Sequence, residues 1–178
     1  MIWQAKYRLP SLAVLSIIKL MTPAINLLNQ QKISHTIHQY VHDTGVQSYG
    51  GEAADKLGVP ADHIFKTLVV SVDSQYLAVA ILPVGHSLNL KSVAKILSGK
   101  KAAMADKVAV QRSTGYVLGG VSPIGQKVRL KTVIDESAIN LAGIFVSAGR
   151  RGLEIELAPT DLCRICDAKF ASIIQSKH

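Results

Sequence analysis

The chain has 178 residues, of which 48% are hydrophobic and 18% are charged. This length suits one domain, and this composition excludes an intrinsically disordered chain. Two cysteines are too few for a disulfide framework, and an aromatic content of 5% argues against a large stacking platform for bases. The formal net charge of +8 indicates an anionic partner, without choosing between nucleic acid and a membrane surface.

Residues 1–20 consist of a short basic segment followed by an apolar stretch, residues 12–18. The stretch is too short to cross a membrane, and no small-x-small cleavage site follows it. Thr22-Pro23 suits the cap and first turn of a helix. We therefore expect an N-terminal extension outside the native domain, a biological start at Met21, and a single cytoplasmic domain over residues 21–178.

Hydrophobic periodicity and turn residues divide the rest of the chain into helices and strands. We expect helices over residues 25–31, 52–57, 90–97 and 106–113 and after Pro159, and strands over residues 35–41, 65–72, 76–82, 128–134, 143–147, 153–157 and 169–174. Many of these strands follow one another directly instead of alternating with helices. The sequence therefore predicts an α+β fold with a mixed sheet.

The positive charge is concentrated between residues 85 and 131. This segment contains nine lysines and arginines and one acid, Asp106, so it accounts for the whole net charge of the chain. Such a concentration inside a folded domain is typical of phosphate contact. A solvated lysine-rich face is the alternative interpretation.

Lys66 is the first candidate for chemistry. In a strand it shares a face with the apolar residues Leu68 and Val70, because strand side chains alternate between the two faces. An ammonium on an apolar face is costly unless it opens onto a cleft or meets an anion. If the strand is internal, Lys66 faces a substrate; if the strand lies at an edge, the side chain reaches out to solvent.

Two glycine-containing segments are candidates for ligand contact. Adjacent glycines in residues 119–125 allow main-chain N–H groups to approach a ligand closely, although an ordinary glycine turn has the same composition. The segment matches no nucleotide-binding motif. Residues 147–152 form either a polar hairpin tip or a set of donors for a terminal nucleotide.

The sequence carries no pattern for metal binding or for a conventional nucleophile. No cysteine or carboxylate pattern completes a metal site around His35, His38 and His42. Cys163 and Cys166 lie in an expected helix, which favours core packing over a redox role. No Ser-His-Asp signature is present. We therefore expect no metal, no cofactor and, if the protein is a hydrolase, no side-chain nucleophile.

Six segments, taken together and in this order, resemble a known family. They are Met21-Thr-Pro-Ala-Ile, Phe65-Lys-Thr-Leu, Met104-Ala-Asp-Lys, Ser113-Thr-Gly-Tyr, Gly119-Gly-Val-Ser-Pro-Ile-Gly-Gln-Lys and Val146-Ser-Ala-Gly-Arg-Arg-Gly-Leu. The family is that of the YbaK/EbsC Cys-tRNA(Pro) deacylases, which are related to the editing insertion of bacterial prolyl-tRNA synthetases. The resemblance covers about residues 21–175.

The resemblance implies a mixed, barrel-like sheet flanked by helices and a trans-editing deacylase that clears cysteine from tRNA(Pro), with Cys-tRNA(Cys) as a further substrate. Cysteine is too close in size to proline for a synthetase to reject it by binding alone, so a second site must remove it. In the family the cysteine thiol attacks its own ester. The implied partners are the acceptor 3′ end of aminoacyl-tRNA and prolyl-tRNA synthetase, with no membrane and no DNA.

The resemblance also implies site residues. The catalytic positions are Lys66 and Thr67, and the substrate-binding positions are Tyr40, Gly119, Gly120, Ser122, Ser147, Gly149 and Glu154. Two departures from the family pattern stand out. Glu154 replaces the usual aspartate, which bears on specificity for cysteine, and Ala148 replaces a glycine, which would be unfavourable if the position needed a positive φ.

Two other functions remain open at this point. One is a deacylase for Ala-tRNA(Pro) in which water attacks the ester, and the other is a non-catalytic module that binds tRNA or a synthetase. The pair Lys66-Thr67 argues against the second, because a pure binding module has no reason to place these residues in a pocket.

Overall fold

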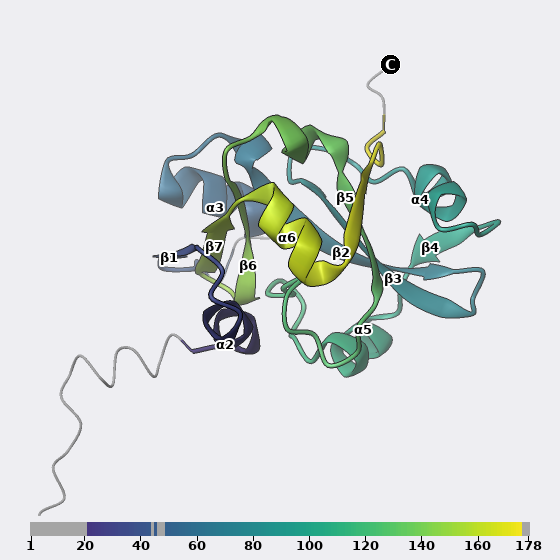
Figure 1. Ribbon diagram of the computed structural model, residues 1–178, viewed down its shortest axis with the longest axis horizontal. Coiled ribbons are helices and arrows are strands. Elements are labelled where there is room, and N and C mark those ends of the chain that lie inside the picture. The colour runs from purple at the N-terminus through teal and green to yellow at the C-terminus, as the bar shows by residue number, and fades with distance from the viewer. Residues whose placement is uncertain (1–20, 44, 46–48, 176–178) are drawn as a thin grey trace, which may run out of the picture.

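The computed structural model describes residues 21–43, 45 and 49–175. This part of the chain forms an eight-stranded sheet with helices on both faces (Figure 1). Its strands are β1 (Thr36–Gln39), β2 (Ile64–Val72), β3 (Tyr76–Pro83), β4 (Ala102–Met104), β5 (Lys131–Asp135), β6 (Ile144–Arg150), β7 (Leu153–Leu157) and β8 (Ala168–Ala171). Its α-helices are α2 (Pro23–Gln30), α3 (Tyr49–Leu57), α4 (Leu90–Ile96), α5 (Lys107–Thr114) and α6 (Pro159–Cys166).

The strands are arranged in the order β1-β7-β6-β2-β3-β5-β8, and β4 pairs with β2. Pairing is antiparallel between β2 and β3 but parallel between β3 and β5, so the sheet is mixed. This confirms the predicted α+β class. The sheet is not closed, because β1 and β8 form its two ends instead of pairing with each other.

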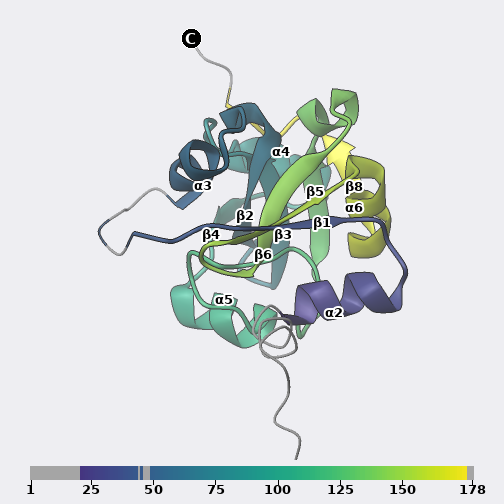
Figure 2. The same cartoon turned by 90° about the vertical axis from the view of Figure 1, so that its left-hand side faces the viewer.

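Alternation along the strands sends apolar side chains to two cores. On β2, Phe65 and Val69 face a core that α2, α5 and α6 cover, whereas Val70 and Val72 face a second core that α4 covers. A smaller cluster joins Ala53 of α3 to Ile64. Figure 2 shows α2 and α5 on one side of the sheet and α3 and α4 on the other.

Helix boundaries follow from capping residues in the sequence. The Thr22 hydroxyl accepts from the N–H of Ile25 at the start of α2, and Asp106 accepts from the first turn of α5. Gly115, with φ of 79°, ends α5 in the left-handed conformation that glycine favours. These caps explain why both helices lie close to their predicted ranges.

Several elements differ from the sequence-based expectation, and α3 and β8 also have other bounds than expected. The strand expected over 128–134 begins only at Lys131, and β4 and the 3₁₀ helices Ala61–His63 and Glu136–Asn140 were not predicted. β4 is a three-residue strand with two alanines, so it carries no β-propensity signal. The expectation for residues 1–20 lies outside the described residues. No described helix is both long and apolar enough to span a membrane.

Candidate active site

The candidate site lies where one edge of β2 lacks a partner strand. β2 pairs with β6 only through Ile64 and Phe65, and with β4 only from Val70 onwards. We call the stretch between these pairings, residues 66–69, the open edge of β2; at its end the Val69 carbonyl accepts from the N–H of Ala105, the residue after β4. A pocket of about 520 Å³ lies against it, a volume typical of small-molecule sites.

β6 carries an irregularity just beyond its pairing with β2. The register between β6 and β7 shifts between Ser147 and Arg150, which is a β-bulge, and a bulge bends the strand that carries it. Gly149 within the bulge has φ of +100°. Ala148 is buried and does not adopt a positive φ, so this departure from the family pattern costs no backbone strain.

Lys66 lies on an internal strand, β2. This is the case in which the sequence predicts that its side chain faces a substrate. Its ammonium donates to the carbonyl oxygens of Val84 at 3.2 Å and His86 at 2.6 Å. These two bonds, which the sequence did not predict, offset the cost of its partial burial, and burial lowers the pKa of the ammonium. A lysine has three N–H donors, so one remains for a ligand in the pocket.

Two residues with hydroxyl groups, Thr67 and Ser147, line the same pocket. The side chains of Lys66 and Thr67 project to opposite faces of β2, yet both reach the pocket because it lies at the open edge. Among the described residues, Thr67 Oγ1 is the one buried side-chain oxygen or nitrogen without a hydrogen-bond partner. Ser147 Oγ accepts from the N–H of Gly149 at 3.3 Å.

Glu154 brings a buried carboxyl group to the pocket. No hydrogen bond or ion pair reaches it from the described residues, and burial raises the pKa of Glu154 to about 8. Burial, together with the charges of Glu154 and Glu52, also raises the pKa of the Tyr40 hydroxyl to about 12. Tyr40 therefore lies close enough for the charge of Glu154 to affect the pKa of its hydroxyl, although Tyr40 does not line the pocket.

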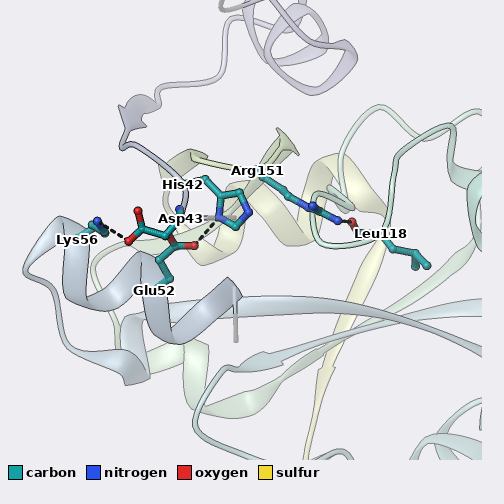
Figure 3. A network of polar contacts seen from close by, with 6 residues as sticks. All are labelled: His42, Asp43, Glu52, Lys56, Leu118 and Arg151. Atoms are coloured by element: carbon teal, nitrogen blue, oxygen red, sulfur yellow. Dashed lines mark hydrogen bonds and ion pairs between the residues drawn. The ribbon is translucent and has the colours of Figure 1, made fainter. Parts of the chain in front are cut away.

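The glycine loop contacts the pocket through one of its predicted residues. Gly119 lines it, whereas Gly120 packs against the main chain of Arg150, 3.1 Å from where a Cβ would stand. Ser122 is fully buried, and its Oγ accepts from the N–H of Ile124. The loop is tied to the β6–β7 turn by Arg151, whose guanidinium donates to the Leu118 carbonyl at 2.9 Å (Figure 3).

A polar network holds the chain after β1 against α3 (Figure 3). Glu52 accepts from the ring of His42 at 2.6 Å and from the N–H of Asp43 at 2.7 Å, and Asp43 pairs with Lys56 at 3.0 Å. The Asp43 N–H, followed by His42, holds the pKa of Glu52 below its ordinary value. This network fixes the segment that follows Tyr40.

The pocket thus brings together five of the predicted residues and leaves out four. Lys66, Thr67, Gly119, Ser147 and Glu154 line it; Tyr40, Gly120, Ser122 and Gly149 do not. Sequence reasoning did not assign the lining residues Gly50, Val84, Met104, Ala105 and Lys107. The segment from Met104 to Lys107 was among the quoted motifs, and this was the available signal for three of them.

The histidines and cysteines take structural positions. His38 and His42 pair with Glu156 and Glu52, and the described residues contain no group of three or more potential metal ligands. Cys163 and Cys166 are free thiols whose Sγ atoms contact main-chain carbonyls.

A family model described as the aminoacyl-tRNA editing domain matches residues 45–165. The chain belongs to this family. A protein of Enterococcus faecalis, EbsC, named as a candidate Cys-tRNA(Pro)/Cys-tRNA(Cys) deacylase, is 35% identical over 152 residues, which cover 85% of this chain and 92% of that protein. The protein is therefore an enzyme of the aminoacyl-tRNA deacylase type.

Two further comparisons agree with this assignment. The proline–tRNA ligase of Geobacter metallireducens is 32% identical over 79 residues, which are 44% of this chain and 14% of the ligase. A crystal structure described as a candidate trans-editing enzyme for prolyl-tRNA synthetase superposes with a TM-score of 0.76 at 19% identity, covering 88% of this chain and 99% of that chain. The second likeness confirms the fold.

Proposed function

We propose that this editing enzyme removes cysteine from tRNA(Pro), and from tRNA(Cys) as well, at the pocket beside the open edge of β2. The family and the name of the Enterococcus faecalis relative support this substrate. The observation that carries the proposal is one combination in the pocket: a fixed ammonium at Lys66 beside hydroxyls that no base activates.

Among the described residues of the pocket, no nucleophilic side chain is hydrogen-bonded to a general base. Thr67 Oγ1 has no hydrogen-bond partner, and Ser147 Oγ accepts from a main-chain N–H instead of donating to a base. A hydroxyl is a weak nucleophile without an adjacent base. This argues against attack by Thr67 or Ser147 and favours attack by a group of the substrate.

The substrate thiol performs the cleavage. The cysteine sulfur attacks its own ester carbon, a C–S bond forms, and the C–O bond to the ribose breaks. The thiol proton passes to the leaving ribose oxygen, which yields a cysteine thiolactone and free tRNA. The third N–H of Lys66 binds a phosphate or ribose oxygen of the terminal adenosine, and this holds the ester in line with the thiol.

Prolyl-tRNA synthetase is the proposed partner. A domain of this size has little surface for reading tRNA identity, and its relatives include segments of proline–tRNA ligases. We expect weak discrimination between Cys-tRNA(Pro) and Cys-tRNA(Cys) by the enzyme alone and stronger discrimination when the synthetase is added. Equal hydrolysis of both tRNAs with and without the synthetase would contradict a working complex.

The decisive experiment compares Cys-, Ala- and Pro-tRNA(Pro) in a single-turnover deacylation assay, with S-methylcysteinyl-tRNA(Pro) as the matched substrate that lacks a free thiol. We expect rapid loss of cysteine and retention of the other three amino acids. Equal cleavage of Ala-tRNA(Pro) would establish water as the nucleophile. Binding of all four substrates without any cleavage would leave only a binding module.

A further inference from the structure

The open edge of β2 exposes main-chain polar groups in the middle of a sheet. The N–H of Val84 donates to the Ile64 carbonyl at 2.9 Å, so even-numbered residues of β2 direct their N–H and C=O groups toward β3. The N–H of Ala105 donates to the Val69 carbonyl at 3.0 Å, so odd-numbered residues direct theirs to the opposite edge. Thr67 is odd-numbered and therefore faces the gap.

Neither neighbouring strand reaches the main chain of Thr67. In the described residues the β6 pairing ends at Phe65↔Val146, and the β4 pairing ends at Val70↔Met104. Ser147 follows Val146 on β6, and Ala105 follows Met104 at the end of β4; both line the pocket. The N–H and C=O of Thr67 therefore face the edge between these two pairings, and Thr67 is one of the residues that line the pocket.

No strand pairing on this edge covers the N–H and C=O of Thr67, and its buried Oγ1 has no hydrogen-bond partner, so the position suits a polar ligand. Buried polar groups in folded proteins are almost always hydrogen-bonded, and an unsatisfied one is costly. The N–H is a donor and the C=O an acceptor, at the spacing that one residue of a neighbouring strand would match. A ligand that matches them must present an acceptor and a donor at the same spacing.

We infer that the main chain of Thr67 pairs with the aminoacyl group of the substrate as if that group were one residue of an antiparallel strand. The substrate α-amino group donates to the Thr67 carbonyl, and the Thr67 N–H donates to the ester carbonyl. Negative charge develops on that carbonyl oxygen during attack, so the same N–H also stabilises the transition state. This inference rests on the proposed function and names how the site holds the amino acid.

The pairing makes the α-amino group a recognition element. A 3-mercaptopropionyl ester of tRNA(Pro) keeps the thiol and the ester but lacks the amino group, so it loses the bond to the Thr67 carbonyl. We expect it to be cleaved at least about tenfold more slowly than the cysteinyl ester, because it loses one hydrogen bond from a charged donor. Equal cleavage of the two esters would contradict the pairing.

An amide-to-ester substitution tests the donor. Replacing Thr67 by its α-hydroxy analogue removes the main-chain N–H and keeps the side chain; the matched control replaces Ser71, whose N–H faces the paired strand β4. We expect the Thr67 ester to lower kcat/KM by about 10²-fold, as for loss of one oxyanion donor, with little change in Tm. The Ser71 ester should lower Tm and retain the rate.

Hydrogen exchange gives a readout that does not depend on activity. The Thr67 amide should exchange faster than the paired Ser71 amide, and a non-cleavable 3′-deoxy-3′-cysteinylamido adenosine should slow Thr67 alone by tenfold or more. Suppose that the wild-type enzyme is active, that the Thr67 ester variant has the wild-type kcat/KM, and that the adenosine analogue does not slow exchange of the Thr67 amide. This result would overturn the inference and leave the proposed function standing. If the wild-type enzyme does not cleave Cys-tRNA(Pro) but the analogue slows exchange of the Thr67 amide, the inference stands and the proposed function fails.

Discussion

The ammonium of Lys66 lies 2.6 Å from the carbonyl oxygen of His86, beyond the end of the neighbouring strand β3. A lysine on an apolar strand face is thus held by the main chain of a loop, with a second bond to the Val84 carbonyl. The geometry fixes the position of the charge before a substrate arrives. Preorganised charge of this kind needs no rearrangement during the reaction.

Replacing Lys66 by alanine should lower the single-turnover rate on Cys-tRNA(Pro) by several orders of magnitude, because orientation of the ester is lost. The variant should remain folded and lose about 1 kcal/mol of stability, since two carbonyls lose a donor. Lys66→Arg should also be poor, because a planar guanidinium does not reproduce the position of a compact ammonium. A thermal melt accompanies each assay. If the alanine variant is normally folded and keeps a near-normal rate, Lys66 does not orient the ester.

Glu154 should make the stability of the fold depend on pH. Its pKa is raised from 4.5 to about 8 in the folded chain, so its contribution to stability is full below pH 4.5 and is lost as the pH rises through about 8. The Tm of the wild type should therefore fall between pH 5 and 8.5. The Tm of the Glu154→Gln variant should fall less over the same range, because its side chain does not titrate. Glu136→Gln, at an exposed position, is the control and should follow the wild type.

Gly149→Ala should damage both stability and activity. A Cβ at this position would lie 2.4 Å from Cε1 of Tyr116, whose hydroxyl is anchored to the Ile124 carbonyl, and φ is +100°. We expect a loss of about 2–4 kcal/mol in denaturant unfolding, from the strained φ and the overpacking. Gly85→Ala is the matched control, because a Cβ there meets nothing within 4 Å. Equal stability of the two variants would show that the bulge tolerates a side chain.

The basic residues between 85 and 131 should contribute unequally to tRNA binding. Lys107 lines the pocket at the start of α5, whereas Lys91 and Lys95 belong to α4, on the other face of the sheet. Lys107→Ala combined with Arg112→Ala should reduce the slope of log K against log salt by about two. Lys91→Ala combined with Lys95→Ala should leave the slope unchanged; a larger effect of the α4 pair would place the tRNA on the opposite face.

Local signals in the sequence predicted the helices and the hairpin but not the open edge. The caps Thr22 and Asp106 act within one turn of chain, and the β2–β3 hairpin joins neighbouring segments, so both are readable from sequence. The partners of Lys66 are 18 and 20 residues away, and the gap depends on where β6 and β4 stop pairing. The raised pKa of Glu154 likewise depends on burial, which only the assembled sheet determines.

The length of the open edge limits what the site can hold. An aminoacyl ester presents a single residue, whereas a peptidyl ester continues from the same amino group into a chain. In the antiparallel direction that chain would run along β2 toward Val69, whose carbonyl already accepts from Ala105. If the aminoacyl group pairs with Thr67 as inferred, the gap has room for one residue, and we expect the enzyme not to hydrolyse tRNA that carries a growing polypeptide.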